Sequence, residues 1–197
     1  MPSPICVAAD SATLAPASAL LAELVRRYWV LGMECGLLEV HKFAWLLDRA
    51  AARSAPDHPL GLSFDAGPYG PQVHGLSDLL APLDGVYLRC ETALRSAGLL
   101  DVIWFDDTRR AELQAWLRRD AAPWLQALED TAAGMDGFES PFGMELLATV
   151  DWLLCREGVA PTVAAVRDGL RQWLGHRSRL FDDRAVGLAL ERAATRF

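Results

Sequence analysis

The segment from Phe142 to Cys155 constrains the fold more than any other part of this sequence. Ten of its fourteen residues are apolar, and they fall on every side of a helix, so only Glu145, Thr149 and Asp151 are left to meet water. A helix that is apolar on all sides is buried inside a protein. Fourteen residues interrupted by charges are too few to span a bilayer. We therefore expect the central helix of a soluble domain.

Helical periodicity recurs on both sides of this segment. The other predicted helices cover 21–31, 37–52, 71–80, 108–133 with a break at Pro123, 162–174, and a last stretch from about Asp182. Short alternating runs at 60–64, 86–88 and 99–105 are typical of strands. The predicted fold class is mainly α (α+β): a compact helical domain around a buried central helix, with two or three short strands forming a small sheet.

The start of the chain differs from the rest. Its first twenty residues carry one charge and no Lys or Arg, so the positive region of a signal peptide is missing. We expect a leader or linker over 1–19 and one domain over 20–197. The four cysteines are widely spaced and form no Cys-x-x-Cys pair or Cys/His cluster. This favours reduced thiols in a cytoplasmic protein, with no metal, no cofactor and no membrane partner.

Charge is unevenly distributed along the chain. The net charge is −7, yet residues 56–107 alone carry eight Asp or Glu against two Arg, and residues 129–157 carry seven against one. Residues 158–197 are basic. Acidic surfaces are common because they keep proteins soluble, so this pattern alone does not identify a partner.

Motifs that would indicate catalysis are sparse. The sequence contains no GxSxG or HExxH motif, and the GPYGP turn lacks the lysine of a phosphate-binding loop. His74 beside Tyr69, with Asp65 or Asp78 nearby, is the only group that acid–base chemistry could use. Nothing supplies an activated nucleophile. The residues therefore predict a protein that is not an enzyme.

Four runs resemble the C-terminal domain of the DarG antitoxins, in the same order and at similar separations. They are LLEVHKFAWLLDRA, LGLSFDAGPYGPQVHGLSDLLAPLDGVYL, GFESPFGMELLATVDWL and HRSRLFDDRAVGLALERA, within roughly residues 20–197. The most specific matches are FESPFGMELLATV and YGP. The order of helix, strand and YGP turn is also distantly similar to the Panacea antitoxin domain.

The resemblance implies a function that composition does not. DarG proteins combine a macrodomain, which removes ADP-ribose from thymidine in DNA, with a C-terminal domain that binds the DarT toxin and imitates its DNA substrate. DarT is a DNA ADP-ribosyltransferase. This chain has no room for a macrodomain. The resemblance therefore implies an antitoxin domain that neutralises a DarT-like toxin by DNA mimicry, without binding nucleic acid itself.

The predicted partner-binding residues come from the segments that carry the resemblance. They are Asp65, Tyr69, Gly70, Pro71, His74, Asp78, Asp84, Tyr87, Glu139 and Glu145. The match departs from the family at Gln72, after YGP, and at Val86, where the family has His. Glu139 equally suits a structural role, because a carboxylate near a helix start stabilises the helix dipole. We expect the three aspartates 65, 78 and 84 to be exposed.

A DNA-binding regulator is the main alternative. Arg167, Arg171, Arg177 and Arg179 could grip phosphate, and helices with a short hairpin could form a winged helix. Arg177 and Arg179 match the basic close of the DarG family, so they could instead pair with the acidic helix. A plain interaction domain without a toxin partner is a further alternative. A regulator would bind DNA with an affinity that falls steeply with salt, whereas a mimic would not bind DNA.

Overall fold

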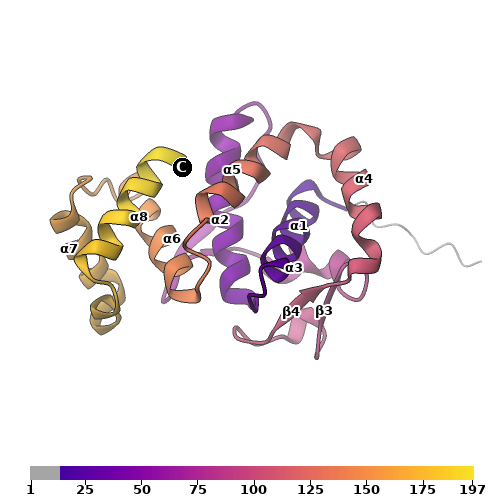
Figure 1. Cartoon of the computed structure of the whole chain (residues 1–197), viewed down its shortest axis with the longest axis horizontal. Helices are drawn as coiled ribbons and strands as arrows, with labels where there is room; N and C mark the ends of the chain where they lie inside the picture. The colour runs from indigo at the N-terminus through magenta and orange to yellow at the C-terminus, as the bar shows by residue number, and fades with distance from the viewer. Residues whose placement is uncertain (1–13) are drawn as a thin grey trace, which may run out of the picture.

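The computed structural model describes residues 14–197, which form eight α-helices and four short strands (Figure 1). The helices are α1 (Pro16–Val30), α2 (Leu37–Ser54), α3 (Leu76–Leu80), α4 (Arg110–Asp120), α5 (Leu125–Met135), α6 (Pro141–Cys155), α7 (Val163–Leu174) and α8 (Asp183–Arg196). The strands are β1 (Phe64–Gly67), β2 (Gly70–Val73), β3 (Leu88–Cys90) and β4 (Ile103–Phe105), and a 3-10 helix, η5 (Gly175–Leu180), follows α7. The predicted mainly helical class is confirmed.

Two helices share the centre of the molecule. Figure 1 shows α2 in the middle, with α1, α4 and the β3–β4 pair on one side and α6, α7 and α8 on the other. Helix α2 packs against α1, α5, α6 and β2, and buries Phe43, Trp45 and Leu47 completely. Helix α6 packs against α2, α7, α8 and β2. The core therefore runs continuously from one helix to the other.

Helix α6 is buried more completely than its sequence predicts. Ser140 caps it, because its Oγ accepts from the backbone N–H of Gly143 at 3.0 Å. Glu145, Thr149 and Asp151 were predicted to meet water, and this is wrong: they are 6%, 0% and 2% exposed. Neighbouring elements cover the polar side of the helix and bring arginines to the two carboxylates, which a local pattern cannot reveal.

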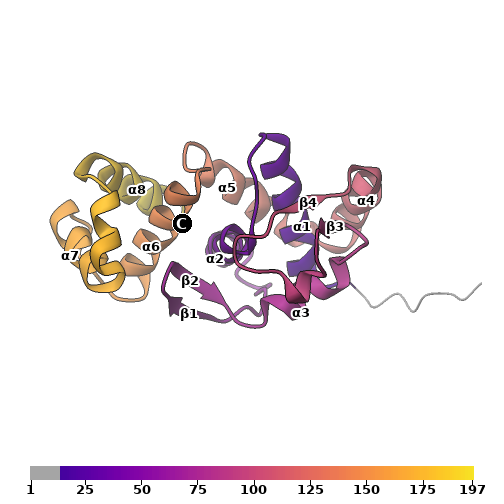
Figure 2. The ribbon, with the colours of Figure 1, turned by 90° about the horizontal axis from the view of Figure 1, so that it is seen from below.

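The GPYGP sequence is the turn of a β-hairpin. Strands β1 and β2 pair antiparallel, with Phe64 opposite Val73, and lie on one side of α2 while α5 packs on the other (Figure 2). Gly70 has φ +94°, and a Cβ there would stand 2.6 Å from Thr149 Oγ1, so only glycine fits. The predicted helix start at Pro71 is wrong because 70–73 pair as a strand, and α3 begins at Leu76.

The remaining boundaries follow local sequence signals. Pro123 lies in the break between α4 and α5, as predicted. Thr162 and Asp182 cap α7 and α8 with their side chains. Helix α1 begins at Pro16, earlier than the predicted Leu21, while the first thirteen residues of the predicted leader and Cys6 lie outside the described residues.

The paired strands form two separate two-stranded sheets, β1–β2 and β3–β4. The second pair is antiparallel, with Leu88 opposite Phe105, and packs on α1. Between residues 14 and 197 no helix is both long enough and apolar enough to cross a membrane.

Candidate functional site

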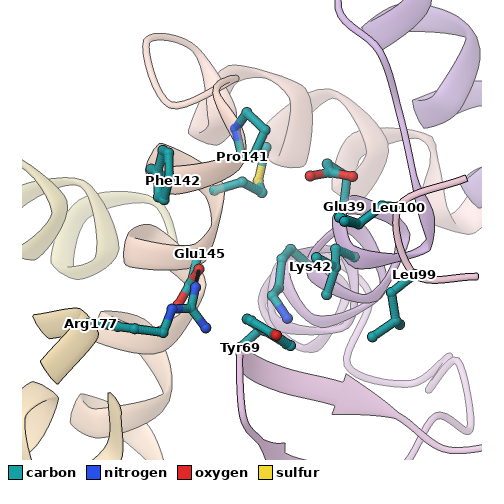
Figure 3. Close-up of a pocket in the computed structure, with 11 residues that line it drawn as sticks. Glu39, Lys42, Tyr69, Leu99, Leu100, Pro141, Phe142, Glu145 and Arg177 are labelled. Carbon is teal, nitrogen blue, oxygen red and sulfur yellow. Dashed lines mark hydrogen bonds and ion pairs between the residues drawn. The ribbon is translucent and has the colours of Figure 1, made fainter. Parts of the chain in front are cut away.

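A pocket of about 330 Å³ lies where α2, the β1–β2 turn, α6 and η5 meet (Figure 3). The segment before β4 closes one side of it. The lining residues are Leu38, Glu39, Lys42, Tyr69, Leu99, Leu100, Pro141, Phe142, Met144, Glu145 and Arg177. Most of the wall is apolar, and four ionisable side chains enter it. We call this site the Lys42 pocket.

Lys42 is a nearly inaccessible ammonium. It projects from α2, is 2% exposed, and its Nζ donates to the carbonyl of Pro71 at 2.9 Å. Burial lowers its pKa to about 8, and the carboxylates Glu145 and Glu39 oppose part of that shift. Among the residues the structure describes, no carboxylate lies within 4.0 Å of this nitrogen.

Glu145 and Arg177 form the second polar element of the pocket. Arg177 Nη2 donates to Glu145 Oε2 at 2.5 Å, Nη1 donates to the carbonyl of Pro68, and the guanidinium lies 4.2 Å from the ring centre of Tyr69. Burial raises the pKa of Glu145, and the charges of Arg177 and Lys42 oppose this. Glu145 Oε1 is buried and has no hydrogen-bond partner among residues 14–197.

Glu39 helps to build the pocket as well as to line it. Its Oε2 accepts from the backbone N–H of Gly36 at 2.8 Å and so caps the first turn of α2. Burial raises its pKa, and the hydrogen bond from Gly36 opposes the shift. The pocket therefore combines two cations with two carboxyl groups that hold a proton more readily than an exposed glutamate. Such an arrangement can bind an anion and donate a proton.

Four of the ten predicted partner-binding residues meet at this pocket. Tyr69 and Glu145 line it, and Gly70 and Pro71 carry the backbone against which Lys42 lies. Glu139 lies just before α6, and its backbone carbonyl accepts from the hydroxyl of Tyr28. Its contribution through the backbone agrees with a structural role.

The other five residues lie elsewhere. Asp65 and His74 form an exposed pair across the β1–β2 hairpin, Asp65 Oδ2 lying 2.5 Å from His74 Nε2, and Asp78 is exposed on α3. Asp84 was expected to be exposed, but it is half-buried because its Oδ2 accepts from the backbone N–H of Leu94 at 3.0 Å. Tyr87 is buried and donates to Glu112. The ten residues therefore do not share one face.

Sequence reasoning missed Lys42, and for Arg177 it left open a phosphate contact or a pairing with the acidic helix. The only sequence signal for Lys42 was the LLEVHK run that carries the resemblance. Its neighbour His41 is buried: Nδ1 accepts from the N–H of Val73, and burial lowers its pKa to about 4. For Arg177, the pairing with the acidic helix is confirmed.

Three of the four arginines named for the alternative, a DNA-binding regulator, are engaged within the molecule, Arg177 with Glu145 as described above. Arg167 pairs with Asp183 at 2.5 Å, and Arg171 pairs with Asp168. In the described part of the chain there is no group of three or more side chains of the kinds that hold a metal ion.

Most of the chain is similar in sequence to known proteins that share one name. No protein-family model matches it. The DNA ADP-ribosyl glycohydrolase of Mycobacterium tuberculosis is 30% identical over 189 residues, which cover 88% of this chain and 51% of that protein. The Thermus aquaticus protein of the same name is 32% identical over 169 residues, covering 81% of this chain and 41% of that protein. The chain thus spans about half the length of these curated relatives, or less.

These relatives confirm the resemblance to DarG proteins at a coarse level and correct two expectations. Their name states an enzymatic activity, so the prediction of a protein that is not an enzyme is wrong, and so is the function predicted with it, a DNA-mimicking antitoxin domain or a DNA-binding regulator. In the structure, two of the predicted partner-binding carboxylates are withdrawn from the surface: Glu145 is buried, and Asp84 accepts from the backbone N–H of Leu94. The assignment to the C-terminal domain and the similarity to Panacea stay predictions.

Proposed function

We propose that this chain takes part in the hydrolytic removal of ADP-ribose from DNA, the activity stated in the names of its relatives. The observation that carries the proposal is the similarity to proteins of that name over 88% of the chain. Because the chain spans about half of those relatives, the proposal concerns its contribution to the activity, alone or within a longer protein.

The Lys42 pocket supplies groups that such a reaction uses. Cleavage of a glycosidic bond needs a proton donor for the leaving group, and a carboxylate that activates water or stabilises positive charge on the sugar. Glu39 and Glu145 are buried carboxyl groups with raised pKa values. Lys42 and Arg177 lie beside them and can hold the anionic parts of a substrate.

The test is release of ADP-ribose from an ADP-ribosylated oligonucleotide, measured for wild type, Glu145→Gln and a control, Glu191→Gln, on the exposed side of α8. We expect at least a tenfold lower rate for Glu145→Gln and no change for the control. Equal rates for all three would contradict a role for the pocket. If the chain alone releases nothing, the same variants in a protein of the relatives' full length test its contribution, and unchanged rates there would refute it.

We propose in addition that the chain binds a protein partner, an ADP-ribosyltransferase of the DarT class, as the resemblance implies. Support comes from a second pocket of about 620 Å³ beside α6 and α8, whose rim carries Phe142, Leu180 and Leu188, each 52–59% exposed. Exposed apolar patches mark protein interaction sites. A net charge of −7 would speed association with a basic, DNA-binding partner.

Co-purification with such a transferase tests the partner. We expect Leu188→Glu to abolish co-purification and Leu99→Glu, at the other pocket, to preserve it. Failure of the wild type to co-purify would refute this partner. Cys35, Cys90 and Cys155 are free thiols, which supports a cytoplasmic setting for both proteins.

A further inference from the structure

Lys42 is a buried charge that has no counter-ion within 4.0 Å among the described residues, whereas three buried carboxylates have one. Glu23 with Arg26, Glu145 with Arg177, and Asp151 with Arg49 are paired at 2.6, 2.5 and 3.0 Å. Lys42 is as deeply buried as these and, among the described residues, has a single neutral acceptor, the carbonyl of Pro71. An ammonium removed from water without an anion is costly, so a ligand that brings a negative group would relieve that cost.

A second cation faces the same space. Figure 3 shows the ammonium of Lys42 and the guanidinium of Arg177 directed toward one another above the ring of Tyr69. Of the two carboxyl groups in the pocket, Glu145 is hydrogen-bonded to Arg177 and Glu39 to the backbone N–H of Gly36. The Lys42 ammonium donates one hydrogen bond, to Pro71, and so can donate others to a further anion. A phosphate fits because it accepts hydrogen bonds from an ammonium and a guanidinium at once.

The mouth of the pocket is apolar, so it favours a ligand in which that anion is attached to an apolar group. Leu99, Leu100 and Phe142 line it and are 40%, 80% and 55% exposed. Side chains of this size are left in water at a cost that a flat, apolar ligand group would remove. A volume of about 330 Å³ is at the lower end of small-molecule sites, which run from roughly 300 to 1,000 Å³.

We infer that the Lys42 pocket binds a nucleoside phosphate, with the phosphate between Lys42 and Arg177 and the base against the leucines at the mouth. The anion and the apolar body follow from the geometry, while the choice of a nucleoside rests on the proposed function. The nucleoside phosphate can be part of ADP-ribose or of a DNA strand. A chain with a net charge of −7 repels a polyanion, so we expect ADP-ribose to be the source.

Calorimetric titration of the purified chain tests the inference. The probes are adenosine monophosphate, ADP-ribose, adenosine, inorganic phosphate and a short single-stranded oligonucleotide. We expect the monophosphate and ADP-ribose to bind at least tenfold more tightly than adenosine or phosphate, with affinities that fall as salt rises. Tighter binding of the oligonucleotide than of ADP-ribose would support the DNA strand as the source.

Three variants locate the binding. Lys42→Met removes the ammonium and is expected to weaken the monophosphate at least tenfold. Leu100→Glu places a negative charge at the mouth, on a side chain that is 80% exposed, so it keeps the fold and is expected to weaken binding at least fivefold. Leu31→Glu, on a side chain that is 63% exposed and lies outside both pockets, is the matched control and is expected to bind as wild type does.

Three results would overturn the inference: no binding of any nucleotide, wild-type affinity in both Lys42→Met and Leu100→Glu, or phosphate binding as tightly as the monophosphate. Should Lys42→Met fail to fold, Leu100→Glu still decides. The proposed function fails separately, when no ADP-ribose is released from DNA although nucleotides still bind.

Discussion

The two carboxylates buried along α6 stand in different surroundings. Asp151 accepts from Arg49 Nε at 3.0 Å, and the same guanidinium donates to the backbone carbonyl of Phe197. Both hydrogen-bonding sides of Arg49 therefore have partners within the protein. Glu145 also pairs with an arginine, but it borders a pocket, and one of its oxygens has no hydrogen-bond partner in the described part of the chain. The same helix thus holds two kinds of ion pair. Asp151 with Arg49, the closed pair, stabilises the fold, whereas Glu145 with Arg177, the open pair, borders the pocket and is available to a ligand.

The sharpest test of this contrast is Asp151→Ala. Removing the carboxylate leaves Arg49 without its counter-ion in a largely buried place, and breaking a buried pair costs about 3 kcal/mol. Chemical denaturation should show this loss in the free energy of unfolding. A loss below about 1 kcal/mol would mean that the closed pair contributes no more than a surface pair does.

The pH dependence of stability tests Lys42. Its pKa is about 8 in the folded state, below the ordinary value of 10.5, so between these values the unfolded chain binds more protons and stability rises with pH. We expect wild type to gain roughly 2 kcal/mol relative to Lys42→Met from pH 8 to 10.5. Denaturation curves of both proteins at each pH measure the difference. Parallel pH profiles would show that Lys42 is not a buried ammonium.

Glu145 lies near the start of α6, which Ser140 caps. Ser140→Ala tests how much this cap stabilises that end of the helix. Loss of the hydrogen bond to the N–H of Gly143 is expected to cost about 1 kcal/mol. Amide hydrogen exchange should speed up in the first turn of α6 and stay unchanged around Asp151. Uniform acceleration along the helix would mean that the two ends open together.

Glu145→Gln should have the smallest effect on stability, below about 1 kcal/mol at neutral pH, because Arg177 is one-third exposed and water can solvate it. Burial raises the folded pKa of Glu145, so wild type gains stability as pH falls through that pKa toward the unfolded value of 4.5, and the variant lacks this gain. Thermal unfolding of both proteins between pH 7 and 4 measures it. A larger loss for Glu145→Gln than for Asp151→Ala would reverse the comparison.

Sequence reasoning succeeded where local chemistry decides. The helix starts at Thr162 and near Asp182 and the break at Pro123 were predicted, because they depend on capping side chains and proline geometry within a few residues. The all-round apolar pattern of α6 predicted its burial. It could not predict that the polar positions of α6 are buried too, because Arg49 and Arg177 come from elements far along the chain.

Only part of the candidate site could be predicted from the sequence, for the same reason. Tyr69 and Glu145 were predicted because they belong to recognisable motifs. Lys42 was passed over because a single lysine in an amphipathic helix is ordinarily exposed. Its burial follows from the β1–β2 hairpin, which covers α2 and sets the carbonyl of Pro71 against its ammonium. Ionisable groups that meet through tertiary packing leave no local pattern.

The tip of the β1–β2 hairpin is held by three side chains from two distant segments of the chain. Trp173 Nε1 donates to the carbonyl of Gly67, Arg177 donates to that of Pro68, and Lys42 donates to that of Pro71. Helix α2, early in the chain, and the α7–η5 segment, late in it, therefore grip one loop between them. A truncation ahead of α7 would release two of the three anchors and let Tyr69 swing away from the lysine, so we expect the ligand cavity to be the first feature lost when the chain is shortened.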